Sequence, residues 1–317
     1  MMIRRAFSAS RTALATLLFG ALLAGCASSL PRATPVSEGV ARVDLGKVAV
    51  TMLSDGSAVR PLDANYVRNA PLADVQASLK EMGLATDKLT VVFNTLVVDV
   101  GGQRVLLDTG NGEFGAATAG KLLENMGKAG IDPKSITAVV ISHFHGDHIN
   151  GLRNKAGQLV FPNAKVYVPA PEWNWWMDDA RMNATPEAGR GNFTNARRVF
   201  SPMAASVIRF EPGKEVLPGV RSIPAYGHTP GHTAFMIEGG KRKLLYWADS
   251  TNVDLFVRNP DWAVMFDMNA DEARETRHRI ARLAIAENAL VAGFHLSNPG
   301  IGTLSVRGKG YDFTPLK

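Results

Sequence analysis

What the chain lacks narrows its class. The 317 residues include one cysteine, so no disulfide can form within the chain. Its 30 glycines and 17 prolines follow no repeating period, which argues against a fibrous or disordered protein. The formal net charge is +6, but the positive excess is not gathered into one block. Without a basic stripe or a recognised module, no nucleic-acid partner is expected.

The N-terminus carries the pattern of a secretion signal. Arg4, Arg5 and Arg11 form a basic segment, and the apolar run Ala13–Leu23 follows it. A run of this length suits the apolar core of a signal peptide and is too short for a permanent membrane span. The next residues, Ala-Gly-Cys ending at Cys26, complete a motif that resembles the lipobox of bacterial lipoproteins. Residues 1–26 are therefore predicted to be a lipoprotein signal peptide, with lipidation at Cys26.

This prediction has consequences for location and boundaries. The mature chain would lie in the bacterial cell envelope, held to the membrane by lipid and facing the periplasm. The alternative is a plain cleaved signal with a chance cysteine, which would leave the protein soluble in the periplasm or secreted. Residues 27–39 are rich in Ser and Pro and are expected to form a flexible tether. The folded domain is expected to span residues 40–317.

Short β-like runs and helical patterns are mixed along the rest of the chain. Expected strands lie at 48–53, 89–100, 104–107, 136–142, 166–168, 208–210, 234–237 and 244–247, and expected helices at 117–129 and 271–288. Ser54-Asp55-Gly56 predicts a turn after the first strand. Residues 172–200 are less regular and rich in aromatic residues, as in an insertion or lid. The mixture predicts one α/β domain.

The most informative stretch runs from His143 to His148, directly after an apolar run. Alternate side chains of an extended segment share a face, so His143 and His145 can point the same way. Asp147 and His148 follow where the chain must turn, and Gly146 lets the backbone bend between them. Three imidazoles and a carboxylate within six positions suit a metal ion such as Zn²⁺.

The remaining histidines allow more than one interpretation. His228 and His232 stand at the two ends of one turn, whereas His295 and Asp249 each follow an apolar run. Polar residues at the ends of buried strands are how an α/β sandwich would assemble a metal site. A single histidine at a strand end is nevertheless usually structural or exposed, so either role is open for each of these residues. His278 lies between two arginines on the long helix and is expected to be solvated.

Together these residues resemble a known family. The run from His143 to His148 is similar to the HxHxDH signature of the metallo-β-lactamase superfamily. His232, Asp249 and His295 match the later motifs of that family in order. Asp108 matches an aspartate in a turn that precedes the signature. The resemblance implies an αββα sandwich in a single domain. The stretches at 161–164, 228–232, 293–302 and 308–311 are similar to secreted methyl parathion hydrolase-like and lactonase-like members.

The resemblance also implies a site with two zinc ions, although other divalent metals suit the same ligands. One ion would be held by His143, His145 and His232, and the other by Asp147, His148 and His295, with Asp249 bridging both. A hydroxide shared by the metals would attack the substrate, and Asp147 would orient it or pass a proton to the leaving group. Asp108 would support the ligands from behind, and His228 would either do the same or simply stabilise its turn.

The substrate implied is a small lactone, aryl ester or organophosphate triester. Its apolar part would meet a pocket walled by aromatic rings, for which the candidates are Phe114, Trp173, Trp175, Trp176 and Phe193; ordinary core or lid packing is the alternative for each ring. A bridging carboxylate at Asp249 argues against a β-lactamase. That activity, and a non-catalytic metal-binding envelope protein, remain the competing hypotheses. The resemblance further implies a homodimer.

Overall fold

The computed structural model describes residues 30–240 and 242–317, of which 31–317 form one compact unit. The predicted signal peptide and Cys26 lie outside the described residues. Part of the predicted tether is ordered: strand β1 (Thr34–Ser37) pairs antiparallel with β2 (Val40–Asp44). β1 is the edge strand, where Pro35 can be accommodated because its missing N–H breaks no central ladder. The prediction of a tether through residue 39 was wrong for this segment.

The first sheet has eight strands in sequence order, β1 to β8. After β2 come β3 (Ala49–Pro61), β4 (Lys88–Val100), β5 (Gln103–Leu107), β6 (Ala138–Val140), β7 (Lys165–Pro169) and β8 (Ile208–Phe210). Pairing is antiparallel from β1 to β5 and parallel from β5 to β8. The carboxyl ends of β5 and β6 therefore lie at the same edge.

The second sheet has seven strands, ordered from β15 to β9. They are β9 (Glu215–Leu217), β10 (Val220–Pro224), β11 (Thr233–Ile237), β12 (Leu244–Tyr246), β13 (Leu290–Ala292), β14 (Ile301–Arg307) and β15 (Gly310–Pro315). Only β12 and β13 are parallel. Their carboxyl ends also share an edge.

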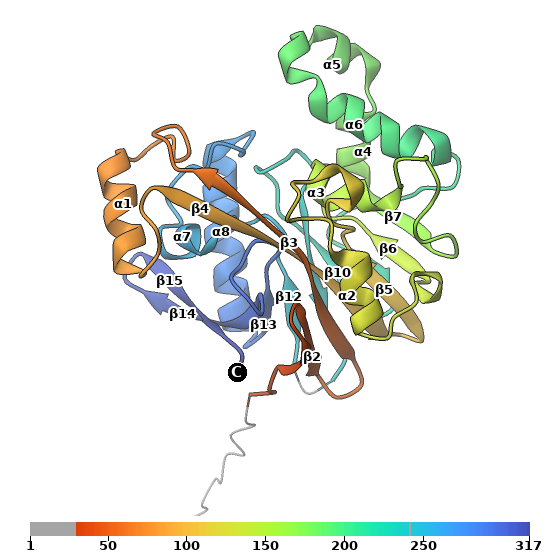
Figure 1. Cartoon of the computed structure of the whole chain (residues 1–317), viewed down its shortest axis with the longest axis horizontal. Helices are drawn as coiled ribbons and strands as arrows, with labels where there is room; N and C mark the ends of the chain where they lie inside the picture. The colour runs from red at the N-terminus through yellow and green to blue at the C-terminus, as the bar shows by residue number, and fades with distance from the viewer. Residues whose placement is uncertain (1–29, 241) are drawn as a thin grey trace, which may run out of the picture. The chain divides into compact units, whose positions relative to one another are not determined.

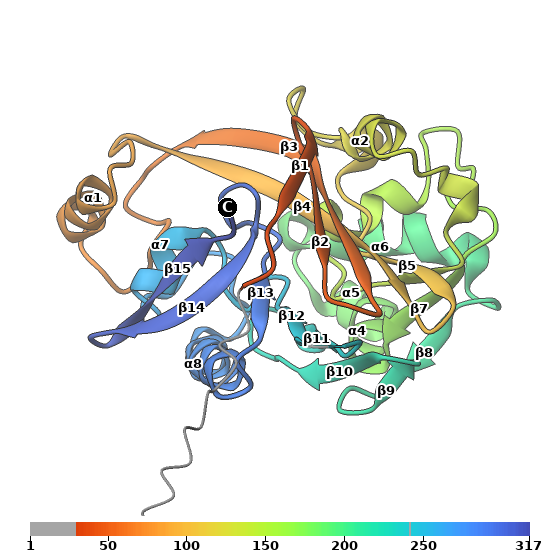
Figure 2. The same cartoon turned by 90° about the horizontal axis from the view of Figure 1, so that it is seen from below.

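The described helices are α1 (Leu72–Glu81), α2 (Leu122–Lys128), α3 (Gly146–Ile149), α4 (Ala170–Trp176), α5 (Asp179–Ala184), α6 (Gly191–Phe200), α7 (Asp254–Arg258) and α8 (Ala270–Ala286). Among them, α2 and α6 cover the outer face of the first sheet and α8 that of the second (Figures 1 and 2). Alternate residues of β5 explain the layers: Val105 and Leu107 join the core between the sheets, whereas Leu106 joins the core shared with α2 and α6. Ile280 of α8 belongs to a third core against the second sheet. The result is the expected αββα sandwich.

Two local predictions were wrong. Ser54-Asp55-Gly56 is not a turn: β3 continues through a bulge there, with Gly56 at φ +92°. Residues 172–200 are mostly helical, forming α4, α5 and α6, and α5 stands clear of both sheets at the top of Figure 1. These helices are short, and Pro186 and Gly189 stand between α5 and α6, so their periodicity was hard to see in the sequence.

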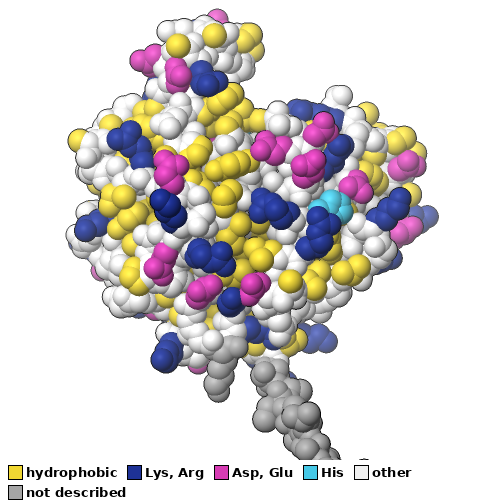
Figure 3. Space-filling view, turned by 180° about the vertical axis from the view of Figure 1, so that it is seen from behind, with side chains coloured by type: hydrophobic (Ala, Val, Ile, Leu, Met, Phe, Trp, Pro, Cys, Tyr) yellow, Lys and Arg dark blue, Asp and Glu magenta, His cyan; other side chains and the backbone are white. Residues whose placement is uncertain are grey.

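The described surface carries charges of both signs. On the face drawn in Figure 3, Lys and Arg side chains alternate with Asp and Glu. Among the helices in residues 30–240 and 242–317, none combines the length and the apolar character that a membrane crossing requires.

Candidate metal centre

The site is assembled from loops that follow five strands. Asp108 follows β5, the His143–His148 segment follows β6, and His228 lies in the turn between β10 and β11. Asp249 follows β12 and His295 follows β13. The backbone is left-handed at Asp108 (φ 57°) and at Ala248 (φ 46°), beside Asp249. Such conformations cluster at functional sites because the surrounding structure must hold them.

Three histidines form a first cluster. Nδ1 of His145 lies 3.1 Å from Nε2 of His143 and 3.0 Å from Nε2 of His228. Burial, together with neighbouring histidines, holds the pKa of His143 and of His145 well below the usual range. The imidazoles of His143 and His145 are therefore neutral near pH 7, which is the form that offers a lone pair to a metal.

His232 borders this cluster, with its ring centroid 4.9 Å from that of His143. Its Nδ1 is 2.9 Å from the carbonyl oxygen of Ala225, and its Nε2 accepts the N–H of Asp249 at 3.0 Å. Both ring nitrogens are thus engaged by the backbone. His228 instead has Nδ1 held at 3.0 Å by Asp267, which leaves Nε2 directed at the cluster. In this geometry Nε2 of His228, and not that of His232, lies with the ring nitrogens of His143 and His145, and the metal-binding roles predicted for the two histidines stay predictions.

Asp147, His148 and His295 form a second cluster, and Asp249 lies between the two. Oδ2 of Asp249 is 3.3 Å from Nε2 of His228 and 3.1 Å from Nε2 of His295. Its Oδ1 is 3.2 Å from Nε2 of His148. One carboxylate thus faces ring nitrogens from both clusters.

The donor atoms fit metal ions. Nε2 of His148 and Oδ1 of Asp249 are buried without a hydrogen-bond partner, although they face each other. Burial raises the pKa of Asp249, but His295 and His148 outweigh it and hold that pKa well below the usual range. A buried carboxylate and an unpaired imidazole nitrogen are costly unless something satisfies them, and a shared metal ion would do so.

Asp108 supports the second cluster from behind. Its Oδ2 is 2.8 Å from Nδ1 of His148 and accepts the hydroxyls of Ser142 and Tyr246 at 2.7 Å each, while Oδ1 accepts the N–H of Ser142 at 2.8 Å. The carboxylate is fully buried and fixes the orientation of the His148 ring. Tyr246 was not foreseen, because it lies inside a strand far away in the sequence.

A cavity of about 650 Å³ opens beside His145. Trp175, Trp176 and Phe193, three of the aromatic residues expected to wall a substrate pocket, line it. Phe114 and Trp173 do not: Phe114 lies under the guanidinium of Arg198, and Trp173 packs against Phe200. Among the residues that were missed, Arg181, Ala184, Thr185, Gly189 and Asn192 come from α5, α6 and the segment between them. The others are Arg68, Met265, Phe266, Asp267 and Met268. They come from loops whose sequence has no distinctive spacing.

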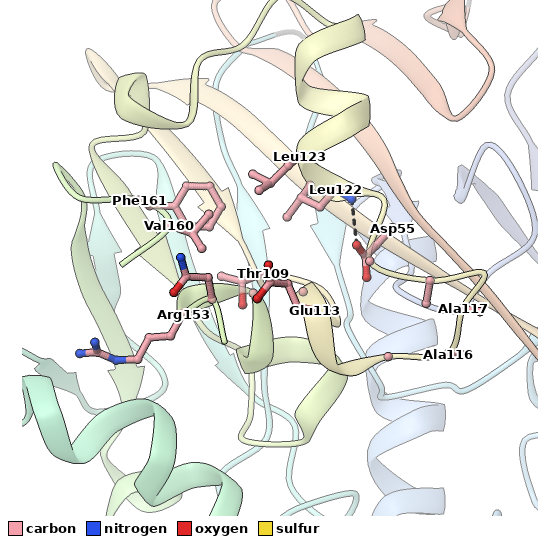
Figure 4. Close-up of a pocket in the computed structure, with 16 residues that line it drawn as sticks. Asp55, Thr109, Glu113, Ala116, Ala117, Leu122, Leu123, Arg153, Val160 and Phe161 are labelled. Carbon is pink, nitrogen blue, oxygen red and sulfur yellow. Dashed lines mark hydrogen bonds between the residues drawn. The ribbon is translucent and has the colours of Figure 1, made fainter. Parts of the chain in front are cut away.

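A second cavity, of about 340 Å³, contains none of the predicted ligands (Figure 4). Asp55 lies at its edge, with Oδ2 accepting the backbone N–H of Asn111 and Oδ1 that of Leu122. The bulge in β3 thus directs a buried carboxylate that anchors the loop after Asp108.

The fold and the paired clusters define a class, the metal-dependent hydrolases built on an αββα sandwich. Comparison with protein-family models matches residues 91–293 to the Metallo-beta-lactamase superfamily, and the chain belongs to that superfamily. The family and fold predictions are thereby confirmed.

Solved structures extend the likeness to most of the chain. AidC, a dizinc quorum-quenching lactonase solved with a product, is 27% identical with a TM-score of 0.82, over 88% of this chain and 98% of AidC. The hydrolase AbOPH, of the beta lactamase superfamily, is 25% identical with a TM-score of 0.81 over the same shares.

Curated relatives match a shorter part. A protein named probable metallo-hydrolase from Mycobacterium tuberculosis is 27% identical over 140 residues, 43% of this chain and 42% of that protein. The atrochrysone carboxyl ACP thioesterase of Passalora fulva is 25% identical over 158 residues, 50% of this chain and 37% of the thioesterase. The matches span less than half the length of these relatives.

Proposed function

We propose that this protein is a two-zinc hydrolase of small ester-like substrates: lactones, aryl esters or organophosphate triesters. The observation that carries the proposal is the position of Asp249, whose carboxylate faces His228 of the first cluster and both His148 and His295 of the second. A carboxylate so placed suits a bridge between two ions. The likeness to AidC and AbOPH supports the same class of reaction.

His143, His145 and His228 would hold one ion, and Asp147, His148 and His295 the other. When bound, two such ions supply an activated water as nucleophile and stabilise the developing negative charge of the substrate. Asp147 is the most exposed of the carboxylates at the centre, at 23%, and lies 3.5 Å from Nε2 of His295. That position suits transfer of a proton to the leaving group.

The cavity beside His145 would receive the substrate. Trp175, Trp176 and Phe193 offer apolar surface for an acyl or aryl group and exclude water from the reacting bond. Arg68 places a polar group on the same wall. This mixture favours a compact substrate with one apolar part and one polar, hydrolysable part.

The test is hydrolysis by purified protein carrying two zinc equivalents. Acyl-homoserine lactones, aryl esters, organophosphate triesters and β-lactams form the panel, with His145→Ala as the inactive variant. His278→Ala is the matched control, because His278 lies on α8 and contacts Asp261 and Tyr311 instead of the clusters. Turnover of an ester-like compound that His145→Ala abolishes supports the proposal. Failure on every ester-like compound, or turnover of β-lactams alone, contradicts it.

We also propose that the mature chain is a lipoprotein of the bacterial envelope, with Cys26 as its lipidated residue. The support is the sequence pattern of residues 1–26, in which a basic segment and a short apolar run precede the lipobox-like motif. A small, partly apolar substrate could reach a site held at the membrane surface.

A further inference from the structure

Glu172 in α4 is a fully buried carboxylate that the proposed reaction does not use. A buried charge is unfavourable unless hydrogen bonds compensate it. Three N–H groups do so here. Oε2 accepts the backbone N–H of Phe144 at 2.9 Å and the indole N–H of Trp176 at 2.8 Å, and Oε1 accepts the backbone N–H of Gly231 at 2.7 Å.

Two of these donors belong to the loops that carry the first cluster. Phe144 stands between His143 and His145, and Gly231 belongs to the turn that begins at His228. One side chain therefore joins the backbones of two loops that are far apart in the sequence. Since each loop supplies ring nitrogens to the same cluster, their separation must be kept within narrow limits.

The packing around Glu172 leaves little freedom. A Cβ placed on Gly231 would lie 2.4 Å from the backbone nitrogen of Glu172, so the turn rests directly on the start of α4. The same helix carries Trp175 and Trp176, which line the cavity. Glu172 thus relates three parts of the site to one another: both ligand loops and one wall of the cavity.

We propose that Glu172 is a positioning residue that sets the distance between the His143–His145 loop and the His228 turn, and thereby the affinity of the first cluster for its metal ion. This inference rests on the proposed function only for the presence of metal. It does not depend on which ester is hydrolysed.

Glu172→Gln is the informative variant, because it keeps the size of the side chain but offers only one acceptor oxygen. The amide oxygen can serve Phe144 and Trp176 together, and the NH₂ group then faces the N–H of Gly231. Two donors cannot pair, so the His228 turn should move away. The second cluster, whose ligands have no contact with Glu172, should keep its affinity.

The measurement is zinc binding in competition with a chelator, resolved into two dissociation constants, on the full-length protein. Cobalt substitution gives a second readout, because its visible absorption reports the geometry of each ion. One of the two dissociation constants belongs to the first cluster, and Glu172→Gln should raise that constant by about 10- to 100-fold, which is the usual effect of losing an outer hydrogen-bond partner. Glu275→Gln, at an exposed position of α8, is the matched control for loss of one charge.

Trp176→Phe separates positioning from packing. It removes one donor to Glu172 but leaves both loop contacts, so both zinc affinities should be retained. Unchanged zinc affinities in Glu172→Gln would overturn the proposal, and so would an equal loss in Trp176→Phe. A wild-type protein that binds two zinc ions but hydrolyses no ester would contradict the proposed function alone.

Hydrogen exchange of the wild-type protein provides a test that does not require the variant to fold. The amides of Phe144 and Gly231 should be protected and should exchange together, because one carboxylate holds both. Exchange of the two amides by separate openings would count against a shared anchor.

Discussion

His228 and His232 stand at the two ends of one turn, and their contacts separate their roles. His228 has one nitrogen held by Asp267 and the other directed at His145. His232 has both nitrogens engaged by backbone atoms. Nε2 of His228 faces other candidate ligand atoms, whereas both ring nitrogens of His232 face backbone groups. We therefore expect the first to bind metal and the second to hold the Asp249 loop in place.

The two histidines should therefore differ in a metal assay. His228→Ala should remove one zinc equivalent and lower kcat/KM by more than the roughly 100-fold loss expected for an outer contact. His232→Ala should keep two zinc equivalents with weaker affinity, since it releases the backbone of Asp249. Metal analysis after dialysis checks both variants. Loss of one equivalent in His232→Ala, with none lost in His228→Ala, would restore the assignment made from the sequence.

At the scale of an element, α8 supplies a buried cation to the loop that supports His228. Arg277 is 2% exposed; it lies 3.2 Å from Asp267 and donates to the carbonyl oxygens of Ser250, Pro260 and Trp262. Through these hydrogen bonds, Arg277 connects α8 to the loop that follows β12 and to residues 260–262, which precede α8 in the chain.

Removing this cation should be costly. Arg277→Ala leaves Asp267 buried without its cationic partner and with only the contact to His228, and the free energy of unfolding should fall by about 3–5 kcal/mol. Arg274→Ala breaks an exposed pair with Asp271 in the same helix and should cost at most about 1 kcal/mol. Urea unfolding of the metal-free proteins measures both values. Equal losses of unfolding free energy in the two variants would contradict the prediction that the buried pair contributes more to stability than the exposed pair.

The bulge in β3 gives a second prediction at this scale. Gly56 has φ +92°, and a Cβ there would lie 2.1 Å from the carbonyl oxygen of Thr118. Gly83 has φ +71° but nothing within 4 Å of its Cβ position. Gly83→Ala should therefore cost only the left-handed backbone penalty of about 1–2 kcal/mol, and Gly56→Ala clearly more. Thermal unfolding compares them, and a smaller loss for Gly56→Ala would contradict the close approach.

At the scale of the whole molecule, metal should stabilise the fold, because both sheets and five loops meet at the site. With free zinc at about 100 times the dissociation constant, binding to the folded state adds about 2.7 kcal/mol, or roughly 5 °C in Tm for a chain of this size. Calorimetry with zinc and with a chelator checks this. Identical Tm values with zinc and with the chelator would contradict the prediction that the clusters bind metal in the folded protein.

The proposed anchor is also a property of the whole chain. Full-length protein expressed in a bacterial host should enter the detergent phase and carry lipid on Cys26, whereas Cys26→Ser should lose both properties. Phase partition and mass measurement of the mature N-terminus decide between lipidation and plain cleavage. A wild-type mature protein without lipid would support the soluble alternative.

The sequence by itself determined the features that depend on local spacing. Alternating and helical apolar patterns located most of the strands and α8, and the run from His143 to His148 indicated a metal site before any fold was known. Tertiary structure alone decided that Ser54–Gly56 is a bulge and that the segment around Trp175 is helical. It also decided which of His228 and His232 faces the first cluster, and that Glu172 joins two loops. The physical reason is that each of these outcomes depends on partners from distant segments. The partners of a ring nitrogen or a buried carboxylate are set by how separate loops come together, and the neighbouring residues in the sequence do not reveal those partners.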